Sequence, residues 1–210
     1  MDGQEDLALD TLIQQFGLHV SSQADVFARA APVALSVLLR ETLVDSVPLA
    51  LNISTKKARS EFIIAPVLAE VRRLGGGSIS LFSGVDLMVD AEAGLGGVCD
   101  FLFSLSPLQL IVQAPVIAVV EAENDNIKTG LGQRVAEMLA AQRFNARRGA
   151  ELPNVYGAVT TGSAWKFLRL RGADVTVDEA EYYIHQPEMI LGILVFMVQD
   201  ARQQQGSFVS

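Results

Sequence analysis

The spacing of apolar residues predicts that the N-terminal part of the chain is helical. The expected helices cover residues 5–16, 21–40 and 56–74. Pro32 lies inside the second helix and is expected to break it, and Pro48 is expected to close the region. Ser54 or Thr55 is the expected cap of the third helix, and glycines follow both the first and the third helix.

Apolar runs that suit β-structure dominate the middle of the chain. The expected strands cover residues 79–89, 98–103, 116–123, 155–161, 164–170 and 174–177, and further helices cover 129–147 and 187–203. The strand that begins at Val116 is the most hydrophobic, so we expect it at the centre of the sheet. This order predicts an α/β fold with a mixed sheet flanked by helices. We expect an N-terminal helical extension over residues 1–50 and an α/β domain over 51–210, together forming one structural unit.

Composition narrows the classes of protein that this chain can belong to. The chain has 210 residues, half of them hydrophobic, and a single cysteine, which excludes an intramolecular disulfide and a cysteine-based zinc site. The longest apolar run, 189–198, is too short to span a bilayer, and the acidic N-terminus does not resemble a signal peptide. We therefore expect a soluble, cytoplasmic protein that does not interact with membranes.

The formal net charge of −8 argues against a strong non-specific nucleic-acid binder, which normally carries a basic face. It leaves room for a local basic patch, and it agrees with a site that is built from carboxylates.

Three carboxylates interrupt or end the apolar strands. Asp100 lies within the strand 98–103, and Glu121 and Glu123 end the strand 116–123 on one face of it. Because an unpaired buried carboxylate is costly, these side chains need an offsetting charge. Adjacent strands would bring Asp100 and Glu121 roughly 5 Å apart, a separation that suits one oxygen-ligated Mg²⁺ or Mn²⁺ ion.

Five segments occur in a fixed order on this skeleton. They are Lys57–Pro66, Ser80–Gly84, Val119–Ala122, Gly130–Gln133 and Thr160–Phe167. With Asp100 on the intervening strand, they resemble uncharacterised bacterial, notably cyanobacterial, proteins of the PD-(D/E)XK (restriction-endonuclease-like) nuclease superfamily. The resemblance covers roughly residues 55–200. It implies a restriction-endonuclease-like fold, a Mg²⁺- or Mn²⁺-dependent nuclease activity, nucleic acid as a partner and, by analogy, a homodimer.

The resemblance also implies roles for individual residues. Asp100 and Glu121 match the metal ligands, Glu61 matches a helix glutamate that completes the metal shell, and Gln133 matches a polar residue of the following helix. Glu123 departs from the pattern because it stands where the superfamily usually has lysine. Either Glu123 or Lys128, which lies at the entrance of the next helix, would then position the attacking water.

All of these residues except Glu61 also have a structural interpretation. Glu121 and Glu123 could be strand-end residues that face water, and Asp100 could form a salt bridge with Arg59 or Lys56. Lys128 could be a solvated surface lysine, and Gln133 could cap or satisfy a backbone group. The sequence therefore predicts either a metal-dependent nuclease with a non-standard glutamate, or a catalytically degenerate nuclease-fold protein with a binding or scaffold role.

Overall fold

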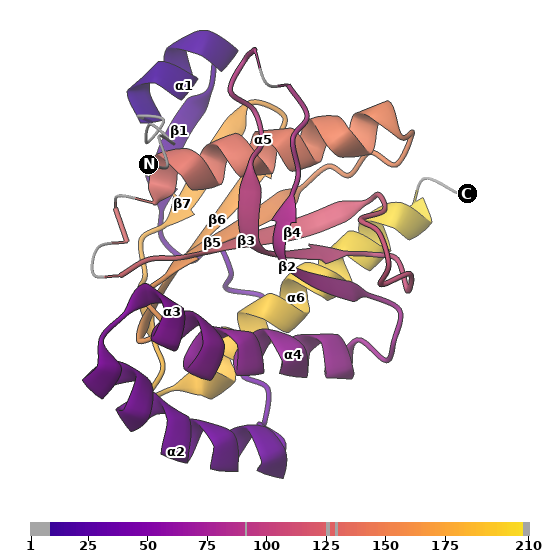
Figure 1. Ribbon diagram of the computed structural model, residues 1–210. Coiled ribbons are helices and arrows are strands. Elements are labelled where there is room, and N and C mark those ends of the chain that lie inside the picture. The colour runs from indigo at the N-terminus through magenta and orange to yellow at the C-terminus, as the bar shows by residue number, and fades with distance from the viewer. Residues whose placement is uncertain (1–8, 91, 125–126, 129, 208–210) are drawn as a thin grey trace.

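The computed structural model describes residues 9–90, 92–124, 127–128 and 130–207, and it places helices on both faces of one mixed β-sheet (Figure 1). The helices are α1 (Leu9–Phe16), α2 (Val37–Ile53), α3 (Lys56–Arg59), α4 (Ala65–Leu74), α5 (Leu131–Arg147) and α6 (Pro187–Ser207). Helices α1 and α5 cover one face of the sheet, and α4 and α6 cover the other. Helix α2 packs on α4, outside this second layer. Each face of the sheet has its own cluster of buried apolar side chains.

The sheet has the order β1-β7-β6-β5-β4-β3-β2, and the short strand β8 pairs with β6. The strands are β1 (His19–Gln23), β2 (Ser80–Asp86), β3 (Val98–Ser104), β4 (Val116–Ala122), β5 (Val155–Thr160), β6 (Ala164–Arg171), β7 (Asp174–Asp178) and β8 (Tyr182–Tyr183). Strand β4 lies inside the sheet, antiparallel to β3 and parallel to β5, and all of its residues are buried. A strand covered on both faces is continuously apolar, which explains why β4 is the most hydrophobic strand. The mixed, helix-flanked α/β sheet expected from the sequence is confirmed.

The helix expected over 56–74 is present and contains a π-helical turn. Helix α3 is capped by Thr55, whose side chain accepts a hydrogen bond from the Ala58 N–H. The π-helical turn η1 (Ser60–Ile64) follows, and α4 then continues to the glycine at its C-terminal end. The cap therefore fixes the backbone of Lys56, the first residue of α3, close to the ends of β3 and β4.

The prediction of a helix over residues 21–40 is wrong. Residues 19–23 form β1, which pairs in parallel with β7, and the next helix, α2, begins only at Val37. Strand β1 is mainly exposed and polar, so it lacks the alternation that marks a half-buried strand. The side chain of Ser36 caps α2 by accepting a hydrogen bond from the Leu39 N–H. Pro48, expected to close the region, lies exposed within α2 instead.

Candidate functional site

Asp100 and Glu121 lie side by side where β3 and β4 leave their ladder. The antiparallel register pairs Phe101 with Val120, so Asp100 and Glu121 follow as the next opposed residues. At this point the Asp100 side chain replaces the backbone of β3 as the hydrogen-bond partner of β4. Its Oδ2 accepts a hydrogen bond from the Ala122 N–H at 3.0 Å. The structure thus brings together the two residues that the sequence singles out as metal ligands.

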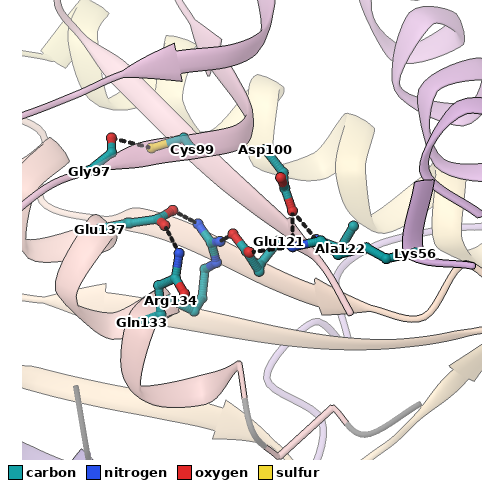
Figure 2. Close-up of polar contacts among 9 residues, drawn as sticks. All are labelled: Lys56, Gly97, Cys99, Asp100, Glu121, Ala122, Gln133, Arg134 and Glu137. Carbon is teal, nitrogen blue, oxygen red and sulfur yellow. Dashed lines mark hydrogen bonds and ion pairs between the residues drawn. The ribbon is translucent and has the colours of Figure 1, made fainter. Parts of the chain in front are cut away.

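The Lys56 ammonium lies between these two carboxylates (Figure 2). Its Nζ is 3.1 Å from Asp100 Oδ2 and 3.2 Å from Glu121 Oε1. Burial acts to lower the pKa of Lys56, but the attraction of Glu121 and Asp100 outweighs it and raises that pKa above its ordinary value. The salt bridge between Asp100 and Lys56, one of the structural interpretations of the sequence, is therefore present. Arg59 instead donates a hydrogen bond to the Thr161 carbonyl at 3.0 Å.

Arg134 of α5 contacts Glu121 from the other side (Figure 2). The Arg134 side chain has no exposed surface, lies 2.6 Å from Glu121 Oε2 and also bonds to Glu137. A buried guanidinium needs such partners, because an uncompensated buried charge is strongly unfavourable. Gly157 on β5 provides the space: a Cβ there would lie 2.5 Å from Met138 Sδ and 3.1 Å from the Arg134 side chain.

The charges of this cluster do not balance. Three carboxyl groups, those of Asp100, Glu121 and Glu137, face the two cations Lys56 and Arg134. Burial raises the pKa of Glu121 to about 8; Arg134 and Lys56 oppose the rise, and Glu137 and Asp100 add to it. The cluster therefore favours one additional positive charge, which either a proton or a metal ion could supply.

Glu61 and Gln133 lie near this cluster but have other nearest partners. Glu61 is exposed and pairs with Lys57 one helical turn away, at 2.7 Å. It shares with Lys56 and Asp100 the lining of a pocket of about 410 Å³. The side-chain amide nitrogen of Gln133 donates a hydrogen bond to Glu137 Oε1 at 3.1 Å. Gln133 therefore contacts a partner of Arg134 rather than one of the predicted metal ligands.

Glu123 and Lys128 lie between β4 and α5. The Glu123 N–H donates to the Thr160 carbonyl at 2.7 Å, and its half-buried side chain packs against Gly130 at the start of α5. A Cβ at Gly130 would lie 2.6 Å from Glu123 Oε1. Lys128 is exposed on the turn before α5. Glu123 thus continues the backbone pairing of β4 with β5 by one residue.

Sequence reasoning missed Arg134 and gave Lys56 only a structural role. Arg134 precedes Met138 by four residues, so it shares the face of the helix that the apolar pattern predicts to be buried. Lys56 directly follows Thr55, one of the two predicted N-caps. The cap therefore fixes the position of the Lys56 backbone, from which its side chain extends. Both signals were present, but neither indicates that the two cations meet at Glu121.

The donor atoms of Asp100 and Glu121 fit a hard divalent cation, because both are carboxylate oxygens and both already contact one ammonium group. Within the described ranges, no group of three or more His, Cys, Asp or Glu side chains is arranged to hold a metal ion. Any metal would therefore have to share these oxygens with Lys56 or displace it.

Two further findings bear on the class of the protein. No helix in the part of the chain that the structure describes has the length and apolar character needed to cross a membrane. Comparison of the chain with protein-family models, with curated proteins and with solved structures finds no match in any of the three.

Proposed function

We propose that the protein is a metal-dependent phosphodiesterase that acts on nucleic acid. The position of Lys56 Nζ, within 3.1 and 3.2 Å of carboxylates on two adjacent strands, carries this proposal. A site that holds one cation between two carboxylates at the edge of an open pocket is suited to binding a divalent cation and an anionic substrate together.

Each residue has a distinct role in this proposal. Asp100 and Glu121 hold Mg²⁺ or Mn²⁺, and Glu61 supports the ion from the wall of the pocket. When bound, the ion would polarise a phosphoryl oxygen and lower the pKa of an attacking water. Lys56, released from the two carboxylates, supplies the positive charge that the resemblance expects from a lysine at the position of Glu123. Glu123 and Lys128 remain the candidates for positioning the water.

Calorimetric titration with Mn²⁺ tests the metal site. We expect the wild type to bind Mn²⁺ and Asp100→Ala to weaken binding at least about tenfold, since it removes one ligand. Asp86→Ala, at the exposed end of the neighbouring strand, is the matched control and should bind like the wild type. If the wild type does not bind Mn²⁺, or if Asp100→Ala binds equally well, the proposal is wrong.

A nuclease assay with Mn²⁺ tests the role of Lys56. Lys56→Met removes the competing ammonium, so we expect it to bind Mn²⁺ at least as tightly as the wild type while cleaving more slowly. A variant that cleaves at the wild-type rate would show that Lys56 does not act on the substrate.

A second candidate is a catalytically degenerate protein with a binding or scaffold role. The observation that favours it is the double pairing of Glu121, whose two oxygens contact Lys56 and the fully buried Arg134. Glu123→Lys separates the two candidates. Cleavage by this variant but not by the wild type would indicate a decayed site, whereas cleavage by the wild type would exclude this second candidate.

A further inference from the structure

Helix α2 carries apolar side chains around most of its circumference, yet the residues that the structure describes cover only one of its sides. Its buried positions are Leu39, Leu43, Ser46 and Ala50, which face α4 and η1. Of the fourteen large hydrophobic side chains exposed among the described residues, six lie on α2 and a seventh lies on η1 beside it: Val37, Leu38, Val44, Leu49, Leu51, Ile53 and Phe62. A helix that is apolar all round is normally covered on both sides, and contiguous exposed apolar patches mark interfaces.

Three of these side chains form a line along the outer face of α2. Val37, Val44 and Leu51 recur every seven residues, close to two helical turns, and are 69%, 68% and 38% exposed. At 3.6 residues per turn, Arg40 lies on one side of this line and Glu41 on the other. The line therefore has a positive and a negative border.

We propose that two copies of this chain associate through α2, with the two helices parallel around a two-fold axis. This arrangement packs the line of Val37, Val44 and Leu51 against the same line of the second copy. It also brings the positive border of each helix opposite the negative border of the other, so that Arg40 meets Glu41 of the second copy twice.

The charges on the borders select this arrangement. In an antiparallel pair, each border would face the same border of the second copy, and Glu41 would lie near a second Glu41 across the axis. Complementary charges beside an apolar line fix the partner and the orientation of paired helices. The apolar line and the charged borders of α2 therefore favour a second copy of this chain as the binding partner. The proposal does not depend on the activity of the site at Asp100.

Sedimentation velocity over a range of protein concentrations tests this proposal. We expect a reversible dimer for the wild type and at least about a tenfold higher dissociation constant for Val44→Glu, which places like charges at the centre of the interface. Leu110→Glu is the matched control, because Leu110 is 87% exposed on a loop far from α2 in the sequence. Circular dichroism should show that both variants remain folded, since neither side chain is buried.

A charge swap tests the parallel orientation. Arg40→Glu alone should weaken the dimer, and Arg40→Glu combined with Glu41→Arg should restore it, because each pair is reconstituted with its signs reversed. A dimer that the double variant does not restore would overturn the parallel arrangement. A monomeric wild type would overturn the whole proposal, as would a dimer that Val44→Glu leaves intact. Sedimentation of a monomeric wild type with phosphatidylglycerol vesicles would instead identify a lipid surface as the occupant.

Discussion

At the scale of single residues, Arg134 connects the core to the candidate site. Its guanidinium is completely buried, and it fixes one oxygen of Glu121 while Lys56 contacts the other. The apolar pattern of α5 places position 134 on the buried side of the helix, but arginine is seldom fully buried unless it is paired. The space left by Gly157 and the carboxylates of Glu121 and Glu137 explain why it is buried here, and the first two depend on how β4 and β5 pack under α5.

Replacing Arg134 by methionine should lower the free energy of unfolding by about 3–5 kcal/mol, because the change leaves Glu121 and Glu137 without their shared cation. Urea unfolding followed by circular dichroism measures this loss. Arg148→Met, beyond the exposed end of the same helix, is the control and should change stability by about 0.5 kcal/mol or less. Equal losses in the two variants would mean that the buried cluster contributes nothing specific.

Gly157→Ala should also destabilise the protein, by about 1–3 kcal/mol, since the added methyl group overlaps Met138 and the stem of Arg134. Gly206→Ala is the matched control: nothing lies within 4 Å of the added carbon, and alanine favours a helix. Thermal unfolding of both variants gives the comparison. If Gly157→Ala is as stable as the wild type, the space beside Arg134 is larger than this packing implies.

At the scale of elements, the sequence predicted those with a strong hydrophobic period and missed those without one. Strands β3 to β6 and helix α5 were predicted to within a few residues, whereas β1 is polar and exposed and gave no signal. The π-helical turn over 60–64 turns the chain by a smaller angle per residue than an α-helix does. The residues after this turn are therefore displaced from the positions that a 3.6-residue period gives them, whereas Glu61 pairs with Lys57 at the ordinary spacing of one helical turn.

The N-caps of α2 and α3 should contribute similarly to stability but differently to the site. Thr55→Ala and Ser36→Ala each remove a side-chain acceptor from a helix N-terminus, so each should cost about 1 kcal/mol in urea unfolding. Only Thr55→Ala should also tighten Mn²⁺ binding, because it loosens the backbone that carries Lys56, whose ammonium competes with the ion for Asp100 and Glu121. Equal Mn²⁺ affinities in the two variants would show that the cap has no influence on the site.

At the scale of the whole molecule, the sheet topology could be predicted in part, and with it the centre of the candidate site. Asp100 and Glu121 were expected to be neighbours because their strands are consecutive, and the antiparallel pairing of β3 and β4 makes them so. Lys56 was one of two cations expected for Asp100, but the contacts of Lys56 and Arg134 with Glu121 could not be predicted. Lys56 lies on a helix 44 residues earlier in the chain than Asp100, and Arg134 reaches Glu121 from across the sheet. Contacts between distant segments depend on packing angles that no local pattern specifies.

The pH dependence of stability should reflect the uneven charge of the cluster. The pKa of Glu121 rises from 4.5 to about 8 on folding, so its contribution to stability is fully present below pH 4.5 and is lost as the pH rises through about 8. The effect of Glu70 on stability has the opposite pH dependence. Its hydrogen bond with Arg73 lowers its pKa, although burial opposes this, and its contribution is lost as the pH falls below 4.5.

The free energy of unfolding should therefore fall between pH 4.5 and 8. Glu121→Gln should remove most of that fall, whereas Glu70→Gln should retain it. Urea unfolding at several pH values measures each slope, and an unchanged slope in Glu121→Gln would show that another group takes up the proton.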